Sequence, residues 1–199
     1  MIIGLTGGMG TGKSTVLSMF RKSGCGTLSA DELARKVMEP QGAVFGRVVK
    51  KFGKGILKRN GTLDRKKLAS IIFARADRKR LLERLTHPAI IRLLKKEIAD
   101  RRKRKGIFVV DVPLLFEADL GCLFDRIILV YASRRVQYLR LARREHLSPD
   151  EIQRRTGAQM SLSAKKKKSD YLLPNDGSKK DLERRVRKIK KSLDRIKGL

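Results

Sequence analysis

The chain has 199 residues, of which 41% are hydrophobic, and it carries a formal net charge of +29. This length supports one sizeable core, alone or with a small subdomain folded over it, and this composition excludes a disordered chain. The apolar N-terminal run lacks a basic flank and is shorter than the ~20 residues that cross a bilayer, which argues against a secretory leader or a membrane span. We therefore expect a cytoplasmic protein without membrane partners. Its two cysteines, Cys25 and Cys122, are too few for a disulfide framework and are expected to be reduced.

The first predicted elements are a strand, a glycine-rich loop and a helix. Residues 2–6 (IIGLT) are apolar and bounded by glycine, as short buried strands are. After the loop, residues 13–24 have the period of a helix that Gly24 ends. Its inward-facing residues are predicted to be Val16, Leu17 and Phe20. A second strand is predicted at 26–29, and a second helix opens near Asp31.

Residues 40–105 have a helical pattern interrupted by loops and are predicted to form a helical subdomain. Pro88 suits the first turn of a helix, which predicts that a helix restarts there. Buried strands return in the run that ends at Asp111 and at 125–132, and residues 170–175 (DYLLPN) are the candidate fifth strand. The alternation of strands and helices predicts a parallel sheet flanked by helices.

The remaining helices are basic. Arginine-rich helices are predicted around 134–147 and 149–168, and the last helix has apolar residues at spacings of three and four, which places its charges on an outer face. The charge is spread along the chain, since residues 1–100 carry +14 and the remainder +15. The runs RRKRK (101–105) and KKKK (165–168) are expected to be solvated surface. We expect no specific nucleic-acid binding, although such a surface binds polyanions non-specifically.

The stretch GGMGTGKS carries the chemistry. Gly7, Gly12, Lys13 and Ser14 satisfy the spacing G-x-x-x-x-G-K-S/T between a buried strand and an amphipathic helix. Backbone N–H groups of such a loop point at phosphate oxygens, Lys13 is expected to reach the β- and γ-phosphates, and the Ser14 hydroxyl is expected to hold Mg²⁺. ATP or GTP with magnesium is the default ligand. The residues predicted to bind ATP here are Gly8, Gly10, Thr11, Gly12, Lys13, Ser14, Thr15 and Val16.

The loop does not decide which group accepts the phosphoryl, since water, a protein, a nucleic acid and a metabolite hydroxyl all remain open. A chain this short, with arginine-rich helices late in the sequence, favours a small-molecule kinase whose lid supplies cations to the transferred group. A kinase for another nucleotide or nucleoside would share the loop and the lid. A nucleic-acid-binding protein with the same loop is suggested only by the charge.

The sequence resembles the dephospho-CoA kinases along nearly its whole length. The motifs that carry the resemblance are GLTGGMGTGKST (4–15), ADELAR (30–35), FGKGIL and NGTLDRKKLASIIF (between 52 and 73), LTHPAI (85–90), VPLLFE (112–117), QYLRLARRE (137–145), and AQMS and KKKKSDYLLPNDGS from 158. The resemblance implies ATP-dependent phosphorylation of the ribose 3′-hydroxyl of dephospho-CoA, the last step of coenzyme A biosynthesis. It also implies a single P-loop kinase domain over 1–199 with a five-stranded parallel sheet, an acceptor-binding subdomain over about 40–105 and an Arg-rich lid over about 134–168.

The same resemblance implies roles for single residues. Asp31 matches the second acid of a family motif that usually reads Asp-Ala-Asp, and that acid is regarded as the base that accepts the hydroxyl proton. Its alternative role is to cap its helix. This sequence has Ser29 at the position of the first acid of the motif, so Asp31 is the one carboxylate that the motif retains. Arg140 matches the lid arginine that contacts ATP phosphates, with Arg143 and Arg144 beside it on the same segment.

Further candidates lie later in the chain. Asn175 matches a position near the adenine end of the ATP site, and an ordinary turn asparagine is the alternative. Asp111 ends an apolar strand where it could contact magnesium through water. Leu114, Leu115 and Phe116 form either a pocket wall or plain core. His87 either binds the acceptor or supports the start of a helix.

Overall fold

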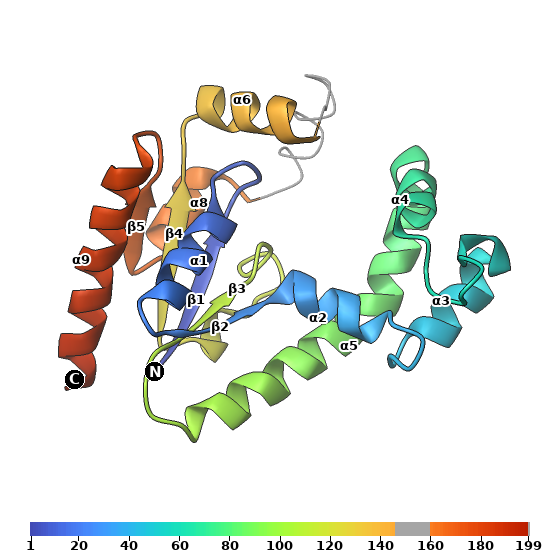
Figure 1. Cartoon of the computed structure of the whole chain (residues 1–199), viewed down its shortest axis with the longest axis horizontal. Coiled ribbons are helices and arrows are strands. Elements are labelled where there is room, and N and C mark those ends of the chain that lie inside the picture. The colour runs from blue at the N-terminus through green and yellow to red at the C-terminus, as the bar shows by residue number, and fades with distance from the viewer. Residues whose placement is uncertain (146–159, 199) are drawn as a thin grey trace. The chain divides into compact units, whose positions relative to one another are not determined.

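The computed structural model describes residues 1–145 and 160–198. Five strands form one parallel sheet in the order β2-β3-β1-β4-β5 (Figure 1). The strands are β1 (Ile2–Gly7), β2 (Gly26–Ser29), β3 (Phe108–Asp111), β4 (Arg126–Tyr131) and β5 (Tyr171–Pro174). The predicted α/β fold with a five-stranded parallel sheet is confirmed.

Helices make up most of the rest of the described chain. They are α1 (Lys13–Lys22), α2 (Ala30–Val37), α3 (Phe45–Phe52), α4 (Arg65–Ala74), α5 (Ala76–Arg102), α6 (Arg134–Glu145), α8 (Leu162–Lys167) and α9 (Lys179–Lys197), with short 3₁₀ turns η1 (Lys54–Ile56) and η2 (Gly121–Leu123). Of the helices in residues 1–145 and 160–198, none is long and apolar enough to cross a membrane. The predicted lid over 134–168 lies partly outside the described residues, which omit 146–159.

The chain divides into two compact units. The sheet unit comprises Met1–Ser29 and Asp100–Leu199, and the helical unit comprises Ala30–Ala99. Each unit has a hydrophobic core of its own. The predicted acceptor-binding role of residues 40–105 stays a prediction.

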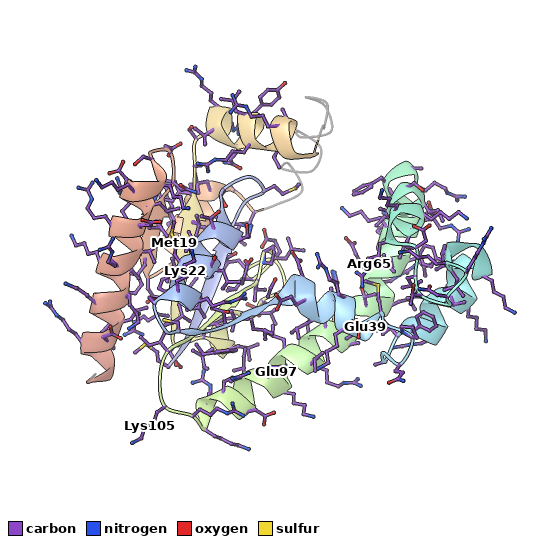
Figure 2. All side chains as sticks on the ribbon, in the orientation of Figure 1. Met19, Lys22, Glu39, Arg65, Glu97 and Lys105 are labelled. Carbon is purple, nitrogen blue, oxygen red and sulfur yellow. The ribbon has the colours of Figure 1, made fainter. Side chains whose placement is uncertain are left out.

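The centre of the sheet unit is β1, in which all six residues are buried because both faces of the sheet are covered. On one face the apolar sides of α1 and α9 pack against β1, β3, β4 and β5 (Figure 1). Met19 and Lys22 mark the last turn of α1 in Figure 2. The buried residues of the two helices are Val16, Leu17 and Phe20 from α1 and Leu182, Val186, Ile189 and Leu193 from α9. The basic side chains of α9 therefore face outward, as the spacing predicts.

The parallel register brings the ends of the strands to a common edge. Leu5 of β1 lies beside Asp111, the last residue of β3, and Gly7 lies beside Val130 of β4. The loop that follows β1 therefore begins at the carboxyl edge of the sheet, which is the edge at which open α/β sheets bind ligands.

The helical unit contains α2, α3, α4 and most of α5 around its own core. Pro88 does not start a helix as predicted but lies inside the continuous helix α5. A proline removes one backbone hydrogen bond of the helix, and here the buried residues Thr86 before Pro88 and Leu94 after it keep the helix packed. Tertiary packing has thus outweighed the local signal for a break.

Candidate active site

The loop between β1 and α1 depends on glycine. Gly10 and Gly12 have φ angles of 71° and 90°, in the left-handed region that glycine adopts without steric cost. Thr11 is buried and donates its hydroxyl hydrogen to the carbonyl oxygen of Gly8, 2.9 Å away. The loop is thereby tied to itself at the start of α1, where backbone N–H groups and the helix dipole attract anions.

Lys13 is the first residue of α1, and its side chain bends back over the loop. Its Nζ donates to the carbonyl oxygens of Gly7 at 2.9 Å and Gly8 at 3.0 Å. A positive charge is therefore held at the loop beside the helix N-terminus, which itself carries a partial positive charge. Both features favour the binding of a polyphosphate.

The structure brings one of the three candidate arginines to this loop. Arg140 of α6 is half-buried, and its Nη2 donates to the carbonyl oxygen of Asn175 at 2.9 Å. Its Nη1 lies 3.4 Å from the carbonyl oxygen of Gly10. Arg143 is exposed on the same helix, and the side chain of Arg144 lies outside the described residues. Of the two candidate arginines whose side chains the structure describes, Arg140 borders the glycine-rich loop.

Sequence reasoning missed the residues that place α6 against the loop. A Cβ built on Gly10 would lie 2.9 Å from the carbonyl oxygen of Gln137, so only glycine allows this approach. At the start of α6, Asp176 accepts a hydrogen bond from the Ser133 N–H at 2.7 Å. That bond, a second one to the Ser133 side chain and the charge of Arg140 hold the pKa of the Asp176 carboxyl below its ordinary value. The one signal in the sequence was an aspartate after Asn175, which an ordinary turn also explains.

Gly12→Ala is expected to weaken ATP binding and to lower the free energy of unfolding. Alanine at the observed φ of 90° costs about 1–2 kcal/mol, and the new Cβ would lie 2.4 Å from the Asn175 Nδ2. Gly24→Ala is the matched control, because φ there is 84° with no heavy atom within 4 Å of the added Cβ. Calorimetric ATP binding and thermal unfolding of both variants would test this. Equal behaviour of the two variants would show that contact with Asn175 does not matter.

The predicted magnesium ligands supply hydroxyl and carboxylate oxygens. Ser14 is exposed in the first turn of α1, and Asp111 is buried at the end of β3. Mg²⁺ in kinases is typically held by one or two such protein oxygens together with substrate phosphates. Residues 1–145 and 160–198 contain no cluster of three or more His, Cys, Asp and Glu that could form a cage made of protein ligands alone. The Ser14 hydroxyl and the Asp111 carboxylate are oxygen donors of the kind that fit a magnesium ion bound together with a nucleotide.

The other residues of the first turn of α1 divide into exposed and buried. Thr15 is exposed beside Ser14, whereas Val16 is fully buried in the core of the sheet unit. The Val16 N–H donates to the carbonyl oxygen of Gly12 at 3.1 Å, so this group already takes part in the helix. The side chain of Val16, a predicted ATP-binding residue, therefore belongs to the hydrophobic core.

The segment after β3 contains both core and surface residues. Leu115 is fully buried, and a Cβ on Gly4 would come within 2.7 Å of its Cδ1, so Leu115 packs directly on the sheet as a core residue. Leu114 is 38% exposed and Phe116 is half-buried. These two remain the candidates for a pocket wall.

The prediction that the KKKK run is solvated is wrong at its first residue. The Lys165 side chain is 3% exposed, and its Nζ lies 2.8 Å from the Glu117 Oε1. Glu117 also accepts a hydrogen bond from the Met160 N–H at 2.9 Å. Burial opposes ionisation of Glu117, but Lys165 and the backbone donors together hold the pKa of its carboxyl below the ordinary value. This carboxylate connects the segment after β3 to the start of α8.

The helical unit holds the remaining predicted site residues. Asp31 is exposed in the first turn of α2, two residues after β2 ends in the chain. His87 is exposed on α5, where it lines an open groove of about 780 Å³. The residues that line the groove are Asp77, Arg80, Glu83, Arg84, His87 and Pro88. The groove combines charges of both signs along one side of a helix.

Comparison with known proteins identifies a family to which this chain is similar along nearly its whole length. The dephospho-CoA kinase family model matches residues 1–181. A dephospho-CoA kinase of Shouchella clausii is 40% identical over 188 residues, which cover 94% of this chain and 95% of that protein. The crystal structure of TT1252 from Thermus thermophilus matches with a TM-score of 0.75 at 33% identity, covering 97% of each chain. A dephospho-CoA kinase from Campylobacter jejuni matches with a TM-score of 0.68 at 26% identity, covering 96% of each.

Proposed function

We propose that this chain, which belongs to the dephospho-CoA kinase family, transfers the γ-phosphoryl group of ATP to the ribose 3′-hydroxyl of dephospho-CoA in one in-line step. The bond from the 3′-oxygen to phosphorus forms as the bond from phosphorus to the bridging oxygen breaks, and ADP leaves with that oxygen. The observation that carries the proposal is the convergence of Lys13 and Arg140 on the glycine loop. Phosphoryl transfer requires such positioning and charge stabilisation more than covalent chemistry by the protein.

Two cations of the sheet unit act on the triphosphate. The Lys13 ammonium sits at the loop and neutralises charge on the β- and γ-phosphates. Arg140 presents a planar guanidinium, which suits the charge spread over the oxygens of the transferred group. The loop N–H groups and the N-terminus of α1 orient the phosphates beneath these cations.

Asp31 accepts the proton of the 3′-hydroxyl in this proposal. The assignment comes from the family motif around ADELAR and agrees with the exposure of the carboxylate at the first turn of α2. A carboxylate in hydrogen-bond reach of the hydroxyl orients the nucleophile and takes its proton as the new bond forms. Ser29, where the family usually has an acid, is buried at the end of β2, so the proposal uses one carboxylate.

Ser14, through its hydroxyl, and Asp111, through its carboxylate, are the residues that would hold Mg²⁺. When bound, the ion supplies positive charge to the β- and γ-phosphate oxygens. Within the helical unit, the acceptor is expected to contact the groove near His87. Within the sheet unit, Leu114 and Phe116 are the residues proposed to contact it. The cytoplasmic location and the absence of specific nucleic-acid binding stay predictions.

An assay of ADP release with Mg-ATP tests the function. Dephospho-CoA, adenosine, AMP and no acceptor are compared, and mass spectrometry identifies the product. We expect ADP release that depends on dephospho-CoA, with one phosphoryl group added to it. Equal stimulation by adenosine or AMP would favour a nucleoside or nucleotide kinase, and no stimulation by any acceptor would overturn the proposal.

A further inference from the structure

Asn175 directly follows β5 and is 6% exposed. Its backbone N–H donates to the carbonyl oxygen of Tyr131 at 2.8 Å, which continues the pairing of β5 with β4 past Pro174. Its side-chain Nδ2 donates to the carbonyl oxygen of Thr11 at 2.7 Å. The carboxyl edge of the sheet therefore holds a buried amide against the phosphate-binding loop.

This hydrogen bond fixes the direction of a peptide unit in the loop. A trans peptide is planar, so its carbonyl oxygen and the following N–H point in opposite directions. When the Thr11 carbonyl points to Asn175, the Gly12 N–H points in the opposite direction within that plane, away from Asn175. Phosphate binding by such a loop needs N–H groups directed at the anion and carbonyl oxygens directed away from it. The Asn175 amide enforces one such orientation.

The same residue also holds the arginine. The Asn175 carbonyl oxygen accepts the 2.9 Å hydrogen bond from the Arg140 Nη2. The Arg140 Nη1 lies 3.5 Å from the Thr11 carbonyl oxygen, so the guanidinium and the Asn175 amide meet at the same peptide. Gly12 leaves room for this arrangement, because a Cβ there would lie 2.4 Å from the Nδ2.

We infer that Asn175 is a positioning residue for the triphosphate, acting through Thr11 and Arg140, rather than a contact to the adenine base. The inference rests on the proposed binding of ATP at the loop and does not depend on the identity of the acceptor. Its consequence is that loss of the side-chain amide weakens binding of any chain of phosphates at the loop, whether or not a base is attached.

Calorimetric binding of Mg-ATP and of magnesium tripolyphosphate, without acceptor, to the whole protein tests this. Asn175→Ala leaves the buried Thr11 carbonyl without its amide donor, so both ligands should bind about 10- to 100-fold more weakly, by the same factor. Asn175→Asp keeps the shape but places a carboxylate oxygen against that carbonyl and adds negative charge near the phosphates. We expect it to weaken both ligands further.

Leu173→Ala is the matched control, because Leu173 lies on β5 two residues before Asn175 and is buried in the core of the sheet unit. It should lower the melting temperature while leaving both affinities unchanged below that temperature. Weakening confined to ATP would assign Asn175 to the adenine and overturn the inference. Unchanged affinities in both Asn175 variants, or equal weakening in Leu173→Ala, would also overturn it. These binding measurements contain no acceptor, so they can still be interpreted if the dephospho-CoA assay fails.

Discussion

Asp31→Asn is expected to lower turnover by about 10²- to 10⁴-fold, which is the usual contribution of a general base. Asparagine keeps the size of the side chain but cannot accept the hydroxyl proton. ATP affinity should change little, because Lys13 and Arg140, the residues proposed to bind the phosphates, lie in the sheet unit and are unchanged. The coupled ADP-release assay with dephospho-CoA measures turnover, and calorimetry without acceptor measures ATP affinity.

Glu32→Gln provides the control for this experiment. Glu32 is the next residue, is exposed and lies in the same first turn of α2, so its replacement removes an equal charge from the same helix N-terminus. If Asp31 only stabilises the helix, both variants should melt earlier by similar amounts and keep their turnover. Near-normal turnover of Asp31→Asn would therefore remove the base from the mechanism. A large loss in Asp31→Asn alone would support it.

The sheet and the phosphate loop could be predicted because their signals are local. Strands such as β1 are continuous apolar runs, and the pattern of Gly7, Gly12 and Lys13 requires a strand before it and a helix after it. The spacing of apolar residues in α9 likewise predicts its buried face. Each of these features depends on residues that are close together in the chain.

The features that could not be predicted depend on residues far apart in the chain. The bond from Asn175 to Thr11 spans 164 positions, so the sequence around Asn175 reads as an ordinary turn. Proline favours the first turn of a helix, but at Pro88 the packing of α5 overrides this local preference and the helix is continuous. Lys165 is the first of four lysines, and only the fold decides which of the four is buried. Charge composition alone cannot make that distinction.

The burial of Lys165 makes its partner a stability determinant. Glu117→Gln is expected to lower the free energy of unfolding by about 3 kcal/mol, because it leaves an ammonium group that is 3% exposed without its counter-charge. The value is at the lower end for buried pairs because the Glu117 side chain keeps 20% exposure and hence some contact with water. Lys165→Met should cost less, since the remaining carboxylate still accepts the Met160 N–H and can be hydrated. Urea unfolding of each variant at neutral pH measures the difference.

The contribution of this pair should also depend on pH in a defined direction. The pKa of Glu117 is lower in the folded protein than its ordinary value of 4.5, so its stabilisation is present above that value and is lost as pH falls through the lowered pKa. The difference in free energy of unfolding between wild type and Glu117→Gln should therefore narrow below about pH 4.5. Asp77→Asn breaks an ion pair with Arg75 whose side chains are 54% and 62% exposed, and it should lower the free energy of unfolding at neutral pH much less than Glu117→Gln does. An equally small effect of Glu117→Gln would mean that Lys165 reaches water or another anion. A difference in free energy of unfolding that narrows as the pH falls would show that the ion pair of Glu117 with Lys165 stabilises the fold.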